Sequence, residues 1–150
     1  MLIHDDLYTW DGWGGKLKLG SGECRLRIYD LTKGDTRAVP HLKPIVVIVS
    51  DVPDPENRIN KMTVRSCAGH IATHVVRDFD IDPNRMIWVE DYSCAADDDD
   101  CRESADQFQQ VEFSWHEPGA IHPAWKTLKP PLLDLVRALA SDEQEGVTDG

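Results

Sequence analysis

Residues 45–49 read Ile-Val-Val-Ile-Val, an unbroken run of β-branched apolar side chains. A run of this kind is typical of a strand that is buried on both faces of a sheet. A helical pattern follows over residues 60–79, and a second strand is indicated at residues 86–90, Met-Ile-Trp-Val-Glu. Strand, crossover helix and strand form a βαβ unit, which has parallel strands and a right-handed connection. The middle of the chain therefore predicts a parallel strand pair.

The helical pattern over residues 60–79 has one apolar face. At 100° per residue, its apolar side chains fall on one side of the helical wheel, and they are Val64, Ala68, Ile71, Ala72, Val75 and Phe79. We expect this face to pack on the sheet. Asn57 or Asn60 is the expected N-cap, because asparagine accepts hydrogen bonds from the first helical N–H groups.

An N-terminal hairpin is indicated by two alternating segments, residues 16–19 and 24–28, joined by a turn centred on Ser21 and Gly22. An even-length loop at this turn sets Leu19 opposite Cys24 on one face. The other face then carries four basic residues, Lys16, Lys18, Arg25 and Arg27. Like charges that face each other destabilise a sheet, so this quartet predicts a negative neighbour. That neighbour is either an acidic residue of the same chain, such as Glu112, or an external anion such as a phosphate or an acidic peptide.

The remaining elements complete the expected fold. A strand is indicated near residues 110–115, residues 116–123 are expected to form a loop, and a helix is expected to begin at Pro130. Together these patterns predict a single α+β or α/β domain over residues 1–140, with a mixed sheet of about five strands. We expect the acidic tail, residues 141–150, to be frayed.

The charge of the chain is uneven. The net charge is −11, yet residues 1–75 hold ten Lys and Arg against nine Asp and Glu, whereas residues 76–150 hold six against eighteen. Such an acidic surface disfavours general nucleic-acid binding and favours a basic protein partner. Our leading hypothesis is therefore a small binding protein that engages a basic partner through acidic residues of its second half: Asp97, Asp98, Asp99, Asp100 and Glu103.

The composition also bears on the compartment. No stretch has the roughly 18 apolar residues of a membrane span, and the first residues lack the basic and apolar segments of an export signal. The four cysteines form no C-x-x-C pair. A cytoplasmic protein with reduced thiols is therefore expected. Cys94 and Cys101 remain open between two free thiols and a redox-responsive pair.

Acidic side chains follow both strands of the predicted parallel pair. Asp51 and Asp54 follow the first strand, and Asp91 follows the second. Ligands of open α/β sheets bind outside the carboxyl ends of the strands, and carboxylates suit Mg²⁺ or Ca²⁺. These residues are candidate metal ligands for a phosphoesterase-like hydrolase, and solvated acidic loops are the alternative.

A second candidate site lies on the predicted helix. Cys67, His70, His74 and Asp78 are three or four residues apart, so neighbouring members lie on adjacent turns. These residue types predict a zinc site, if a further ligand comes from elsewhere, or a Cys–His nucleophile pair. The alternative is a small core cysteine beside ordinary histidines at the margin of a helix. His116, Glu117 and His122 form a looser cluster in the expected loop.

Overall fold

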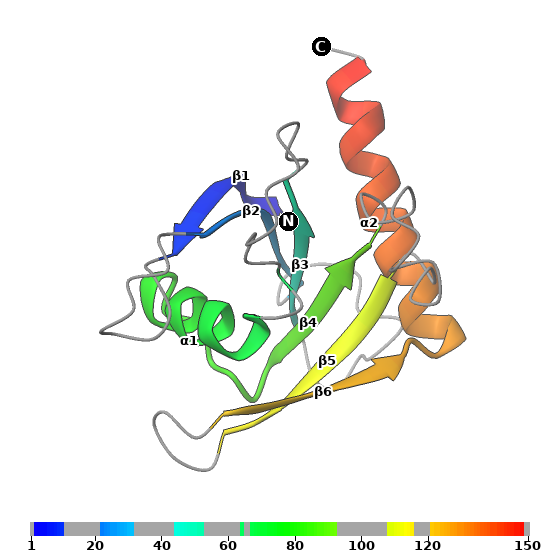
Figure 1. Cartoon of the computed structure of the whole chain (residues 1–150). Helices are drawn as coiled ribbons and strands as arrows, with labels where there is room; N and C mark the ends of the chain where they lie inside the picture. The colour runs from blue at the N-terminus through cyan, green and yellow to red at the C-terminus, as the bar shows by residue number, and fades with distance from the viewer. Residues whose placement is uncertain are drawn as a thin grey trace, which may run out of the picture.

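The computed structural model describes residues 2–10, 22–31, 44–52, 64, 67–92, 108–115 and 121–148, with side chains described as far as residue 141. Within these residues, the strands form one sheet in the order β1-β2-β3-β4-β5-β6, which is also their order along the chain (Figure 1). Their bounds are β1 Leu2–Trp10, β2 Gly22–Asp30, β3 Ile45–Asp51, β4 Met86–Asp91, β5 Phe108–Ser114 and β6 His122–Thr127. The described residues also form two helices, α1 (Ala68–Asp78) and α2 (Pro130–Thr148).

The predicted parallel pair is confirmed. β3 and β4 are parallel, with Ile45 opposite Met86 and Ser50 opposite Asp91, and every other neighbouring pair in the sheet is antiparallel. The mixed α+β fold is confirmed with it. The sheet has one strand more than we expected, since His122 and Pro123 begin β6 instead of ending a loop. Pro123 is tolerated there because β6 is an edge strand, on which a missing N–H can face solvent.

The N-terminal hairpin exists, but its predicted register is wrong. β2 pairs with β1 on one side, where Tyr8 stands opposite Cys24, and with β3 on the other, where Asp51 stands opposite Cys24. Both edges of β2 are therefore occupied, and Leu19 cannot pair with Cys24. Residues 16–19, with Lys16 and Lys18, lie outside the described residues. The pairing with β1 buries the apolar side chain of Trp10, which the predicted hairpin leaves out.

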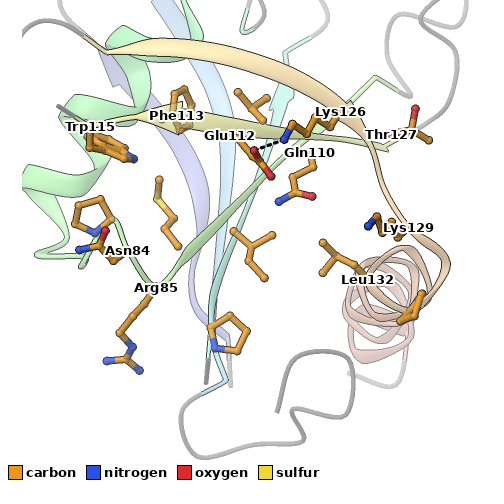
Figure 2. Close-up of a pocket in the computed structure, with 16 residues that line it drawn as sticks. Asn84, Arg85, Gln110, Glu112, Phe113, Trp115, Lys126, Thr127, Lys129 and Leu132 are labelled. Carbon is orange, nitrogen blue, oxygen red and sulfur yellow. Dashed lines mark hydrogen bonds and ion pairs between the residues drawn. The ribbon is translucent and has the colours of Figure 1, made fainter. Parts of the chain in front are cut away.

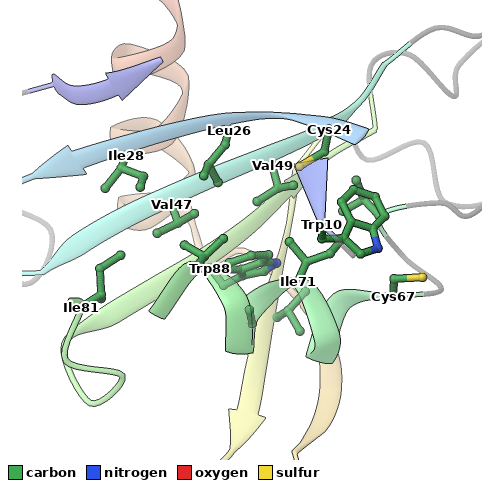
Figure 3. Packing of buried hydrophobic residues seen from close by; sticks show 14 residues of the cluster. Trp10, Cys24, Leu26, Ile28, Val47, Val49, Cys67, Ile71, Ile81 and Trp88 are labelled. Carbon is green, nitrogen blue, oxygen red and sulfur yellow. The ribbon is translucent and has the colours of Figure 1, made fainter. Parts of the chain in front are cut away.

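Helix α1 covers one face of the sheet. Its residues Ala68, Ile71, Ala72 and Val75 are buried, as the helical wheel predicts. Ile71, Ala72 and Val75 belong to a cluster that includes Trp10, Leu26, Val47 and Trp88 from four different strands (Figure 3). The start of the helix differs from our prediction, because α1 begins at Ala68 and not near Asn60. A turn precedes it, in which Cys67 N–H donates to Val64 O at 3.3 Å, and Val64 N–H donates to Asp51 Oδ1 at 2.8 Å.

Helix α2 covers part of the opposite face. Val136 packs there with strand residues of the same face, among them Tyr29, Val46, Ile48, Val89 and Phe108. The helix continues past Ser141 to Thr148, through the segment that we expected to be frayed. In the part of the chain that the structure describes, no helix is long and apolar enough to cross a membrane.

A buried carboxylate ties the sheet together on the α1 face. Glu90 of β4 is fully buried, and its Oε1 accepts hydrogen bonds from the Tyr92 hydroxyl and from Trp125 Nε1–H of β6, the latter at 2.6 Å. The contact with Trp125 bridges β4 and β6 across the intervening β5. A glutamate inside a predicted strand thus joins elements of the fold, and the two hydrogen bonds to Oε1 offset part of the cost of removing the carboxylate from water.

Candidate functional site

The two described members of the basic quartet both pair with carboxylates of the same chain. Arg25 makes two contacts with Asp5, Nε to Oδ1 at 3.1 Å and Nη2 to Oδ2 at 3.2 Å. Arg27 is buried, and its Nη2 lies 3.1 Å from Asp91 Oδ2. We had considered either an acidic residue of the same chain or an external anion as the negative neighbour, and the structure provides the first. Asp5 and Asp91 supply it instead of the Glu112 that we named.

The two described acidic side chains that follow the parallel pair, Asp51 and Asp91, point to opposite faces of the sheet. Successive side chains of a strand point to opposite faces, so Asp51 and the preceding Ser50 point apart. Ser50 Oγ donates to Asp91 Oδ2 at 3.4 Å, beside Arg27 on the α2 face. Asp51 binds Val64 N–H on the α1 face. Asp51 and Asp91 therefore share an edge of the sheet but not a site, and Asp54 lies outside the described residues.

The predicted helix stripe is only partly assembled. The rings of His70 and His74 lie 4.5 Å apart, whereas Cys67 is buried with the core at the start of α1. Among the described residues, no group of three or more His, Cys, Asp or Glu side chains is placed to hold a metal ion. The zinc site, which requires a further ligand from elsewhere in the chain, and the Cys–His nucleophile pair both remain predictions.

Asp78, the last member of that stripe, joins α1 to β1. Its Oδ2 accepts a hydrogen bond from the Tyr8 hydroxyl at 2.5 Å, and its Oδ1 accepts one from Arg77 Nε at 3.1 Å. The hydrogen bond from Tyr8 and the nearby Arg77 lower the pKa of Asp78. Burial and the Asp78 carboxylate raise the pKa of Tyr8. The pair therefore stays as a neutral phenol and an ionised carboxylate, which suits a structural link.

The acidic docking surface stays a prediction. Its residues, Asp97 to Asp100 and Glu103, lie outside the described part of the chain, as do Cys94, Cys101, His116 and Glu117. His122 is described and exposed on the edge strand β6.

A cleft that we did not predict lies where α2 begins. It has a volume of about 660 Å³ and is bounded by the start of β4, by β5 and β6, and by the first turn of α2 (Figure 2). Residues 83–85, before β4, line it from one side, and Lys129, Pro131 and Leu132 line it from the other. The cleft thus lies near the amino end of β4, away from the acidic edge on which the metal hypothesis was based.

The pleat of the sheet brings polar side chains into this cleft. Gln110 and Glu112 alternate with Val111 along β5, so they share the α2 face with the buried Phe108. Lys126 stands opposite Gln110 on β6, on the same face. α2 covers only part of this face, which leaves the polar side chains of β5 and β6 open to the cleft.

The lining of the cleft is cationic. Arg85, Lys126 and Lys129 line it, and Glu112 is the only carboxylate among its described lining residues. Lys126 Nζ lies 2.5 Å from Glu112 Oε2, and both side chains are about half exposed, at 55% and 50% (Figure 2). A local excess of positive charge in a chain of net charge −11 favours an anionic ligand.

Apolar side chains form the rest of the wall. Phe113 and Trp115 stand at the far end of β5, across the cleft from Asn84 and Arg85 (Figure 2). Phe113 packs edge-to-face against Trp115 and against the buried Trp88, each with 5.5 Å between ring centroids. Phe113 and Trp115 alternate with Glu112 and Ser114 along β5, so they point to the α1 face and pack against its core cluster. The cleft therefore takes lining residues from both faces of the sheet, at the place where β4 and β5 separate.

Sequence periodicity could not find the cleft. Its three cationic residues come from the turn before β4, from β6 and from the loop before α2, and Arg85 is some forty residues away from the two lysines. The signal that was present is the Lys126–Lys129 spacing just before the two prolines that open α2. Its meaning depends on where β6 lies, and we had not predicted that strand.

Comparison with known proteins finds no match to this chain among family models, curated proteins or solved structures. The function must therefore be argued from the geometry of the cleft.

Proposed function

We propose that the protein is a binding module whose cleft takes an organic anion that also carries an apolar group. The observation that carries this proposal is that three cationic side chains, those of Arg85, Lys126 and Lys129, line one cleft of about 660 Å³. That volume is within the range of natural ligand sites, which combine an apolar wall with a few polar groups. The anion-binding class that we derived from the hairpin is thus retained, but at a different place in the fold.

The cleft offers different surroundings to the two ends of such a ligand. The anionic group lies beside Lys129 and Lys126, where the first turn of α2 adds the positive end of a helix dipole. The apolar group rests on Phe113 and Trp115 at the other end of β5. Burial of apolar surface supplies affinity, and the cations set orientation and select for negative charge.

A titration with 1-anilinonaphthalene-8-sulfonate, an aromatic sulfonate whose fluorescence rises in apolar surroundings, tests the proposal. We expect Lys129→Glu to weaken binding about tenfold, because it replaces attraction with repulsion at the anionic end. The matched control is Arg137→Glu, an equal charge change at an exposed position of α2 outside the cleft.

Salt provides a second readout. Binding to the unaltered protein should weaken between about 20 mM and about 500 mM NaCl, since ions screen exposed charges. Equal losses in Lys129→Glu and Arg137→Glu would mean that the probe senses only the overall charge of the protein, and the proposal would then be abandoned.

A further inference from the structure

The ladder between β4 and β5 ends before either strand does. The last pair toward the cleft is Trp88 with Val111, although β4 begins two residues earlier, at Met86, and β5 continues to Ser114. Continuing the register would pair Met86 with Phe113, but this pair does not form. β5 stays paired with β6 as far as Ser114, so among the described strands it lacks a partner only beyond Val111, on the edge toward β4.

The main chain of Phe113 faces this open edge. Phe113 stands opposite Pro123, which has no N–H and lies on the edge strand of the sheet. On an edge strand, a proline is found where its nitrogen, which has no hydrogen to donate, faces solvent. The main-chain N and C=O of Pro123 therefore point away from β5. In an antiparallel ladder this makes the pair a non-hydrogen-bonded one, and the N–H and C=O of Phe113 point toward β4. They therefore reach the cleft that opens between the two strands.

A small organic acid would leave these main-chain groups unused, whereas an extended peptide would use them. We infer that the ligand of the cleft is the carboxyl-terminal end of an extended peptide with an apolar last residue. This inference rests on the proposed function and names the class of its ligand. The terminal carboxylate lies beside Lys126 and Lys129, the last side chain lies against the apolar wall, and one residue of the peptide exchanges hydrogen bonds with Phe113.

Each part of this fit has a known physical basis. Extended peptides add to open strand edges through main-chain hydrogen bonds, and side-chain pockets then give specificity. Hydrogen bonds from ammonium groups to a carboxylate are stronger than those between neutral groups. Only alternate residues of an added strand face the edge to which they bind, so a single amide N–H of the peptide is expected to reach Phe113 C=O.

The test uses the full chain labelled with ¹⁵N. The probes are two pools of acetylated tetrapeptides ending in Val, Leu or Phe, one as free acids and the other as carboxyl-terminal amides. We expect the free acids to shift the resonances of the Phe113 amide and the Trp115 indole, and to bind about tenfold more tightly than the amides. Lys129→Glu should remove most of that difference, and Arg137→Glu should keep it.

N-methylation of the peptide separates strand pairing from simple acid binding. In the best-binding peptide, methylating one of two successive amides should weaken binding about tenfold and methylating the other should have little effect, because only one faces Phe113. Equal tolerance of both, or equal affinity of acids and amides, overturns the peptide inference. If 1-anilinonaphthalene-8-sulfonate binds and responds to Lys129→Glu while no free-acid peptide binds, the proposed function stands and the peptide inference fails. If neither probe binds, both fail.

Discussion

The two faces of the sheet are covered to different extents. The α1 face is closed by a helix with four buried residues and by Trp10 and Trp88. Its polar contacts between elements include the exposed one of Tyr8 with Asp78 and the part-buried one of Trp125 with Glu90. The α2 face is covered by a helix that begins beside β5 and β6. Where apolar side chains of this helix no longer cover the sheet, the strands carry charged residues on this face. The sheet is therefore closed over most of its α1 face, and it leaves room for a ligand at the end of β5, where the cleft is lined from both faces.

The charged residues of the α2 face differ between its two ends. At the carboxyl end of the parallel pair, Arg27 and Asp91 are buried and bound to each other. At the amino end, Lys126 and Glu112 are about half exposed and line an open cleft. A buried pair has little freedom to release a partner, because a lone buried charge is costly. An exposed pair can exchange its partner for a ligand at little cost.

The largest effect should come from breaking the closed face. Trp88→Ala removes a side chain that is 1% exposed and in the centre of the α1-face cluster. We expect a loss of about 4 kcal/mol in the free energy of unfolding, from lost burial and a new cavity. The control is Leu132→Ala, at a half-buried position on the α2 face that lines the cleft, and it should cost about 1 kcal/mol. Urea denaturation measures both, and equal losses would contradict the contrast between the two faces.

A smaller loss is expected from breaking the buried pair. Asp91→Ala takes the carboxylate away from the buried Arg27 and Ser50, and should cost about 3 kcal/mol. Asp5→Ala breaks the exposed contact with Arg25 and should cost about 0.5 kcal/mol. The double variant Arg27→Met with Asp91→Leu should recover to within about 1 kcal/mol of the parent, since it leaves no charge buried. A double variant as unstable as Asp91→Ala would show that the pair itself, and not the isolated charge, controls stability.

The dependence of stability on alkaline pH gives a further test of burial on the α1 face. Burial on the α1 face, with smaller contributions from Asp51 and Glu23, raises the pKa of the Cys24 thiol from 9.0 to about 12. Because the unfolded thiol ionises first, its contribution to stability is complete below pH 9 and is lost as pH rises toward 12. By pH 10.5 this contribution should have fallen by about 2 kcal/mol. Cys24→Ala should show a correspondingly shallower alkaline decline in thermal denaturation, and an unchanged decline would contradict the assigned burial effect.

The parts of the fold that were predictable depend on local patterns. The apolar run at residues 45–49 and the wheel of residues 64–79 each determine one buried surface, and both were correctly assigned. Alternation in residues 24–28 correctly separated the apolar face from the arginine face. The partner of that strand was wrong, because β2 pairs with β1, a nine-residue strand whose last residue, Trp10, is buried in the core.

The candidate site was not predictable for a related reason. Strand β6 reads His-Pro-Ala-Trp-Lys-Thr, and a proline within a short run argues against a strand unless its place at the sheet edge is already known. Without β6, neither Lys126 nor the open edge of β5 could be placed. The acidic residues dominated the interpretation because they are clustered in sequence, whereas the cationic cleft is assembled only by tertiary structure.

The smallest effect on stability is expected for Lys126 and Glu112, and this pair also gives the most direct test of the cleft. A double-mutant cycle with Lys126→Met and Glu112→Gln should give a coupling of about 0.5 kcal/mol or less, because solvent screens a half-exposed pair. Glu112→Gln should nevertheless strengthen binding of 1-anilinonaphthalene-8-sulfonate about threefold, since it removes the carboxylate that competes with the ligand for Lys126. Lys126→Met should weaken that binding by a similar factor. A strong coupling combined with unchanged binding would assign the exposed pair the same structural role as Arg27 and Asp91, and the functional contrast between the two ends of the α2 face would be lost.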